Sequence, residues 1–135
     1  MLKDIAATYY NNNYNCAETL LRASNEYYGL NLNDRDMIMM GGYGGGMQVG
    51  SSCGTILGAI AALSIKYIEA KAHESADIGP VVRLLTEKFN EKFGSTLCKD
   101  IKPNYFTKEL RCGNTIAIAC DILEETLAEY EAQKA

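Results

Sequence analysis

Thiols are the side chains of this sequence whose positions predict chemistry. Four of the five cysteines lie where helices are expected to begin: Cys16, Cys53, Cys98 and Cys112. At a helix start, free backbone N–H groups and the positive end of the helix dipole lower a thiol pKa from about 8.5 towards neutrality. Thiolate is the form that binds metals and takes part in redox chemistry. We therefore expect these four cysteines to converge on one partly enclosed site, with Cys53 in the first turn of its helix.

Capping signals support these helix starts. Asn15 and Glu18 have the spacing of a capping box, which places Cys16 in the first turn of its helix. Ser95 is the expected cap of a short helical turn that holds Cys98. Singly, a buried cysteine is more often inert core than a ligand, so the shared position of the four carries the argument.

The remaining cysteine and the spacing between cysteines limit the chemistry. Cys120 lies in the middle of the last predicted helix, on the face shared by Ile116, Leu123 and Leu127, and is assigned to the core. No CxxC pair occurs, so zinc-ribbon, thioredoxin and ferredoxin patterns are absent, and the lack of CxxCH excludes covalently attached c-type haem.

A glycine-rich segment, GGYGGGMQVG at residues 41–50, lies before Cys53. It has neither the GxGxxG spacing nor the lysine of a P-loop, so no nucleotide is expected. Glycine permits positive φ and close backbone approach, so the segment either contacts a cofactor or lets two helices cross closely. Five glycines are candidate cofactor contacts: Gly44, Gly45, Gly46, Gly54 and Gly58.

The elements that position these residues are predicted to be helical throughout. Apolar residues recur at helical spacing, and no segment alternates as a strand does. Helices are expected from Asn15 to Gly29, from Asn33 to Gly41, from near Ser52 to Tyr67, from Pro80 to Gly94 and from about Cys112 to Tyr130, with turns at 41–54 and 102–107. The sequence thus predicts a single all-α domain over residues 1–135, a compact bundle of five or six helices with a glycine-rich loop.

Composition excludes several classes of function. The net charge of −4 gives no support to nucleic-acid or anionic-membrane binding. No signal-peptide core or membrane span is found, so a cytoplasmic protein is expected, with reduced thiols rather than a disulfide framework. His73 is the one histidine and lies in a polar segment, which disfavours Cys–His or Ser–His hydrolysis.

Four motifs together resemble a known family. They are NCAETLL, GGYGGGM followed by SSCGTILGA, FGSTLC and CGNTIAIACDILEE, which extend from about Asn15 to Leu127. The chain is similar to the redox-active family named for its C…GCAxxG…C…C pattern, with Gly54 and Gly58 as the signature glycines. Ser52 departs from the first glycine of that pattern. The resemblance implies a redox-active thiolate site at the four cysteines, with no reaction assigned; a related domain resembles part of a split-Soret cytochrome, whose haem-attachment sequence this chain lacks.

Three functions remain open at this point. The first is electron transfer by an iron–sulfur cluster or another soft metal bound by the four cysteines, with an unidentified redox partner. The second is a metal-free thiol–disulfide oxidoreductase or sulfur carrier, with Cys53 as the attacking thiol. The third is a structural or interaction domain with buried cysteines. The sequence does not decide among these, nor whether the chain is an enzyme or a homo-oligomer.

Overall fold

The computed structural model describes all of residues 1–135 and contains seven α-helices and no strand. The helices are α1 (Leu2–Asn11), α2 (Cys16–Tyr28), α3 (Asp34–Met37), α4 (Gly54–Tyr67), α5 (Ile78–Phe93), α6 (Cys98–Tyr105) and α7 (Gly113–Lys134). Short 3-10 helices at Ile38–Tyr43 and Ala72–Glu74 and a distorted π-type turn at Gly46–Gly50 complete the chain. The all-α prediction is confirmed, with one or two more helices than expected.

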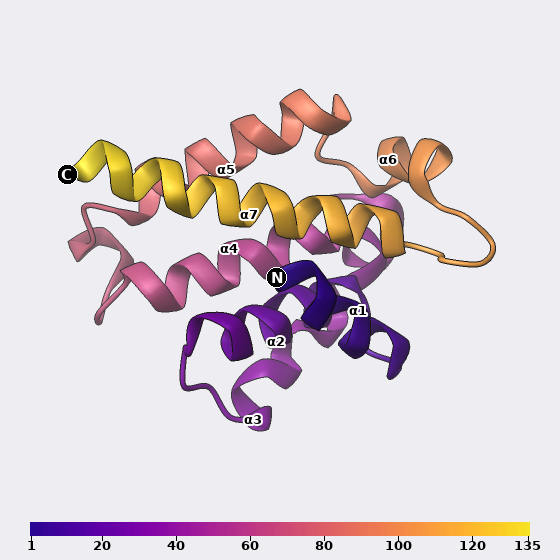
Figure 1. Ribbon diagram of the computed structural model, residues 1–135, viewed down its shortest axis with the longest axis horizontal. Helices are drawn as coiled ribbons and strands as arrows, with labels where there is room; N and C mark the ends of the chain where they lie inside the picture. The colour runs from indigo at the N-terminus through magenta and orange to yellow at the C-terminus, as the bar shows by residue number, and fades with distance from the viewer.

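The long helix α7 organises the bundle. It runs the length of the molecule and packs against α1 and α5, while α2 packs against both α1 and α4 (Figure 1). One apolar core joins these helices and includes Leu20, Leu63, Phe89 and Leu123. Cys120 is fully buried in this core, as predicted. No helix has the length and apolar character needed to cross a membrane.

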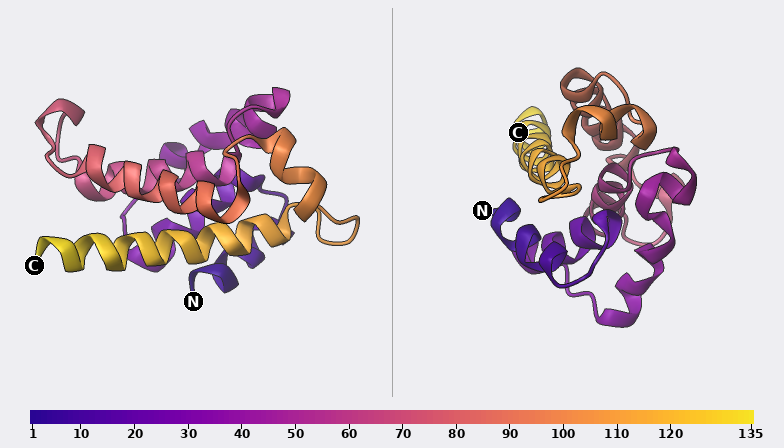
Figure 2. Two further views of the ribbon diagram at one scale, coloured as in Figure 1. Left: turned by 90° about the horizontal axis from the view of Figure 1, so that it is seen from above. Right: turned by 90° about the vertical axis from the view of Figure 1, so that its right-hand side faces the viewer.

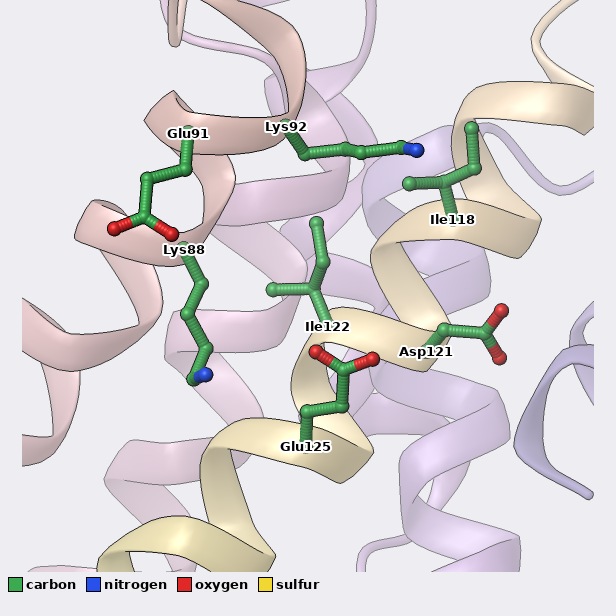
Figure 3. Close-up of a pocket in the computed structure, with 7 residues that line it drawn as sticks. All are labelled: Lys88, Glu91, Lys92, Ile118, Asp121, Ile122 and Glu125. Atoms are coloured by element: carbon green, nitrogen blue, oxygen red, sulfur yellow. The ribbon is translucent and has the colours of Figure 1, made fainter.

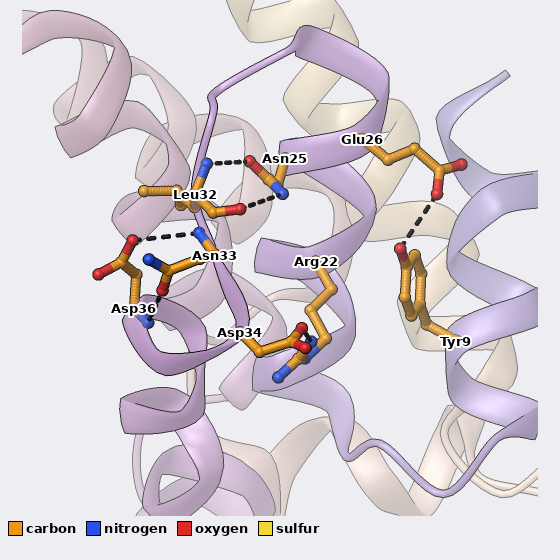
Figure 4. A network of polar contacts seen from close by, with 8 residues as sticks. All are labelled: Tyr9, Arg22, Asn25, Glu26, Leu32, Asn33, Asp34 and Asp36. Atoms are coloured by element: carbon orange, nitrogen blue, oxygen red, sulfur yellow. Dashed lines mark hydrogen bonds and ion pairs between the residues drawn. The ribbon is translucent and has the colours of Figure 1, made fainter.

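Local signals set the bounds of α2 and α3. Both halves of the capping box between Asn15 and Glu18 are formed, and Gly29 ends α2 in the left-handed conformation. Asn33 makes the same reciprocal bonds with Asp36 at the start of α3, beside the ion pair of Arg22 with Asp34 (Figure 4). The predicted helix from Asn33 to Gly41 is thus α3 followed by a 3-10 helix.

Several predicted boundaries are wrong. The helix α1 was not expected; it is held by burial of Leu2 and Ala6 against the core. The segment predicted as a turn at 102–107 is helical through Tyr105, with Pro103 inside α6. The glycine-rich segment leaves the 3-10 helix at Tyr43 and forms a tight turn with positive φ from Gly45 to Gln48, closed by the bond from Ser51 N–H to Gly46 C=O at 2.8 Å.

The starts of four helices lie at one end of the molecule. Figure 1 shows α6 and the first turn of α7 at that end, and Figure 2 (right) shows the same end face on. The first turns of α2 and α4 lie there too, since the cysteines at all four starts line a single cavity. The bundle therefore brings together residues that are far apart in the sequence.

Candidate thiol site

Four cysteines line one small cavity of about 40 Å³, and these are the four that the sequence singled out: Cys16, Cys53, Cys98 and Cys112. Gly45, Thr55, Ile101, Lys102 and Thr115 complete its walls. All four thiols are free, as is that of Cys120. The prediction of a shared cavity is therefore met by all four cysteines, while their role as metal ligands remains a prediction.

The four cysteines hold slightly different positions at their helix starts. Cys16 is the first residue of α2, inside the capping box. Cys53 and Cys112 are the N-cap residues of α4 and α7, so the expectation that Cys53 lies in the first turn is wrong by one residue. Cys98 opens α6 behind Leu97 as N-cap.

A short backbone pairing sets Cys53 beside Cys98. Ser52 and Leu97 form an isolated antiparallel bridge, in which the N–H of Cys53 donates to Thr96 C=O at 2.8 Å and the N–H of Cys98 donates to Ser51 C=O at 2.7 Å. Because side chains alternate along extended backbone, the residues on either side of the bridge project to one face. The pairing thus brings both thiols to the same cavity.

Ser95 does not cap α6 as the sequence suggested. Its hydroxyl accepts a hydrogen bond from the Leu97 N–H at 3.0 Å and donates to the Asp100 carboxylate at 2.8 Å. The serine therefore fixes the turn that leads into α6, while the bridge to Ser52 orients the residues before Cys98.

Burial decides the protonation of the thiols. It raises the pKa of Cys16 to about 11, and it also raises the pKa of Cys53 and Cys112. Backbone N–H groups act in the opposite direction, those of Gly45 and Ala17 on Cys16, yet the loss of hydration is the larger effect. The expectation that helix starts lower the thiol pKa is therefore wrong for Cys16, Cys53 and Cys112.

The electrostatic couplings among the cysteines describe a ring. Negative charge on Cys53 or Cys112 raises the pKa of Cys16, and charge on Cys98 raises the pKa of both Cys53 and Cys112. These couplings connect all four cysteines, which line one cavity. We call these four residues the thiol ring. Several thiolates cannot coexist here without a compensating positive charge.

The two halves of the ring differ in access. Cys16 and Cys53 are 8% and 5% exposed, whereas Cys98 and Cys112 are only partly buried. The sulfur of Cys53 also shares a hydrogen bond of 3.1 Å with the buried Thr55 hydroxyl. Cys53, predicted as the attacking thiol, is thus the more shielded member of its pair with Cys98.

Four of the five predicted glycines lie where a side chain would intrude. Gly45 lines the cavity. A Cβ at Gly46 would lie 2.6 Å from the Cβ of Cys98, and one at Gly54 would strike the sulfur of Cys16. Gly44 packs instead against the Asn15 side chain, and Gly58 against the backbone of α2 at Ala17. Close backbone approach explains Gly44, Gly46, Gly54 and Gly58, whereas Gly45 has open space around it and a positive φ of +62°. Gly45, Gly46 and Gly54 adjoin the thiol ring.

Polar residues that the sequence analysis missed also adjoin the ring. The Cys112 N–H donates to the Tyr10 hydroxyl at 3.1 Å, across most of the chain length. Tyr10, Lys102 and Arg111 each lower the pKa of Cys112, although burial outweighs them. Arg111 directly precedes Cys112, so its position near this thiol could have been predicted from the sequence. The contact of Tyr10 with Cys112 could not, because it depends on the tertiary structure.

Another hollow lies between α5 and α7 but has no thiol. It measures about 390 Å³ and is lined by Lys88, Glu91, Lys92, Ile118, Asp121, Ile122 and Glu125 (Figure 3). Charges of both signs alternate there, and Lys88 is paired with Glu129 at 3.5 Å. His73 lies elsewhere, exposed on a short 3-10 helix. The thiol ring is therefore the candidate site for redox chemistry.

Comparison with protein families agrees with this assignment. The family described as "Putative redox-active protein (C_GCAxxG_C_C)" matches residues 14–126, which include all four cysteines of the ring. No curated protein and no solved structure shows significant similarity to the chain. The match covers most of the chain, and the protein belongs to this family of redox-active proteins.

Proposed function

We propose that the protein transfers electrons through an iron–sulfur cluster bound by Cys16, Cys53, Cys98 and Cys112. The observation that carries this proposal is the convergence of four free thiols, from four helix starts, on one cavity. Four cysteine thiolates are the usual ligand set of such clusters. When bound, the cluster supplies reversible one-electron chemistry that thiols alone lack.

The position of the four thiols around a cavity is compatible with a cluster. A tetrahedral ion with metal–sulfur bonds of about 2.3 Å holds its sulfurs about 3.8 Å apart. In the free-thiol protein, no group of three or more Cys, His, Asp or Glu side chains could hold a metal ion. A cluster spreads its cysteine ligands over more than one iron, which suits thiols that surround a cavity.

The surroundings supply what a buried anionic cluster needs. The N–H of Gly45 faces Cys16, the Thr55 hydroxyl faces Cys53, and the positive charge of Lys102 acts on Cys112. Hydrogen bonds and positive charge stabilise thiolate sulfur and set the reduction potential. Iron would also provide the positive charge without which several ring thiols cannot ionise together.

Anaerobic reconstitution with iron and sulfide tests this proposal. We expect a visible charge-transfer absorption, iron and sulfide in equal amounts, and reversible bleaching by dithionite. The Cys120→Ala variant is the matched control, because it removes the one cysteine outside the ring and should load as the wild type does. Colourless protein without bound iron, at full helical content, would contradict the proposal.

A second candidate rests on the accessibility of Cys98 and Cys112. These are the less buried members of the ring and are neighbours in it, so thiol–disulfide exchange would use this pair rather than Cys53. Such chemistry predicts a Cys98–Cys112 disulfide after mild oxidation, found by peptide mapping under non-reducing conditions. Mixed pairings that include Cys120 would count against it.

A further inference from the structure

A second hollow adjoins the thiol ring and has no role in the proposed function. It measures about 300 Å³, and four residues line both it and the ring cavity: Cys16, Gly45, Lys102 and Cys112. Its remaining walls are Tyr10, Asn13, Tyr14, Asn15, Phe106 and Arg111. We call this hollow the vestibule. It gives a molecule of small organic size a place beside the sulfurs of Cys16 and Cys112.

The vestibule is positively charged in a protein whose net charge is −4. Lys102 and Arg111 line it, and no Asp or Glu does. Neither cation forms an ion pair or a side-chain hydrogen bond, unlike Arg22, which is paired with Asp34. Their charges are therefore free to act on an anion that enters.

Aromatic rings hold the two cations in place without neutralising them. The Lys102 ammonium lies 5.0 Å from the ring centre of Phe106, and the Arg111 guanidinium lies 4.6 Å from that of Tyr10. Such cation–π contacts are attractive and leave the charge intact. Tyr14 adds a third aromatic wall, so the vestibule combines positive charge with flat apolar surface.

The backbone before Cys112 is held in an unfavourable conformation. Arg111 has φ of +53°, which side chains other than glycine, asparagine and aspartate rarely adopt. Two hydrogen bonds with Thr107, of 2.7 and 3.2 Å, fix the turn. The turn places the cation Arg111 directly before Cys112, one of the two thiols that line both cavities.

We propose that the vestibule binds a small organic anion, with its carboxylate or equivalent group at Lys102 and Arg111 and its body against the rings of Tyr10, Tyr14 and Phe106. The bound molecule lies next to Cys112. The charges, rings and volume that carry this inference belong to the free-thiol protein, so it holds whether or not a cluster occupies the ring.

Paired alkylating reagents test the inference on the full-length free-thiol protein. Iodoacetate is a carboxylate and iodoacetamide is its neutral counterpart. With both reagents the same thiolate attacks the CH2 carbon and displaces iodide. Their rate ratio at Cys112 therefore cancels the thiolate fraction and reports the attraction of the anion. Peptide mass spectrometry measures the ratio at Cys112 and, in the same sample, at Cys98, which does not line the vestibule.

Charge variants make the test specific. Lys102→Gln and Arg111→Gln should each lower the iodoacetate-to-iodoacetamide rate ratio at Cys112 by about fivefold. This is the effect of removing one charge that attracts the anion from near contact distance in water. Lys108→Gln removes an equal charge from an exposed position outside the vestibule and should leave the ratio unchanged. Equal ratios in the wild type and in both vestibule variants would overturn the inference.

Competition by a non-reacting anion completes the test. Benzoate should slow the alkylation of Cys112, whereas benzamide, which is neutral, should not. No protection by benzoate, or equal protection by both compounds, would overturn the binding of an organic anion. Reconstitution with iron plays no part in these measurements, so failure here and failure of the proposed cluster are separate results.

Discussion

At the residue scale, the protonation of the thiols is a balance between helix-start N–H groups and burial. The N–H of Gly45 and that of Ala17 stabilise the thiolate of Cys16, but loss of hydration raises its pKa to about 11. A bound metal would reverse this balance, since its positive charge stabilises the thiolate directly. Burial thus favours the neutral thiol at Cys16, Cys53 and Cys112, and metal binding would release their protons.

The raised pKa of Cys16 makes the stability of the free-thiol protein depend on pH. The folded state keeps the proton up to about pH 11, while the unfolded chain loses it near its ordinary value of 9.0. The unfolded state then binds fewer protons, so stability is present below about pH 9 and is lost as pH rises towards 11. The slope is at most about 1.4 kcal/mol per pH unit for one thiol.

Urea unfolding under reducing conditions at pH 7.5 and pH 10 measures this dependence. The free energy of unfolding should fall between the two values, and it should fall less in the Cys16→Ala variant. An identical fall in both proteins would show that Cys16 titrates at its unfolded value.

Position 54 requires glycine because it packs directly against the Cys16 sulfur. In Gly54→Ala, the new methyl group would strike the Cys16 sulfur and lie 3.2 Å from the Tyr43 carbonyl oxygen. We expect a loss of about 1–3 kcal/mol of stability by overpacking, together with weaker iron loading. Gly42→Ala is the control, because nothing lies within 4 Å of a Cβ there. Equal stability of the two variants in urea unfolding would refute this packing account.

At the element scale, the capping box of α2 ties a helix start to the thiol ring. Asn15 accepts from the Glu18 N–H at 3.0 Å and donates to the Gly41 carbonyl at 2.8 Å, which links α2 to the first residue of the glycine-rich segment. Cys16 follows directly. The same amide therefore fixes the start of the helix and the backbone that approaches its thiol.

Asn15→Ala should cost about 1 kcal/mol of stability and reduce iron loading, because Cys16 loses its fixed position. Asn33→Ala removes the equivalent capping box from α3, a helix that contains no ring cysteine (Figure 4). This variant should lower stability without changing iron loading. Thermal unfolding and iron content measure the two effects. Equal iron loading in both variants would contradict the role given to Asn15.

The elements that sequence predicts well are those with local signals. The capping box and Gly29 bound α2, and Gly94 ends α5 in the left-handed conformation, since both depend on a few neighbouring residues. The bridge of Ser52 with Leu97 joins segments that are 45 positions apart and has no local signature. The helix α1 also has no strong local signal, because it is held by tertiary contacts with α2 and α7.

The same contrast between local signals and tertiary contacts applies to the thiol site. Residue type and position at helix starts were enough to select the four cysteines that meet. The pKa direction was wrong for Cys16, Cys53 and Cys112, because burial depends on how the whole bundle closes over the thiols. The roles of Tyr10 and Lys102 could not be predicted for the same reason, because their interactions with Cys112 are between different helices.

At the scale of the whole molecule, the bundle builds the thiol ring from helix starts at one end (Figure 2). The close crossing of α2 and α4 is central, since Gly58 packs on the α2 backbone and Gly54 on the first thiol of α2. The bundle leaves Cys98 and Cys112 partly exposed, so electrons would enter and leave on the side that carries the vestibule.

The iron content of a set of single cysteine variants, reconstituted together, tests most directly that the four thiols form one binding site. Cys16→Ala, Cys53→Ala, Cys98→Ala and Cys112→Ala should each lose most of the iron and the visible absorption of the wild type, while Cys120→Ala keeps both. Circular dichroism confirms that the variants remain helical. Wild-type loading in two or more of the four ring variants, or loss of iron in Cys120→Ala alone, would contradict a single site built from all four thiols.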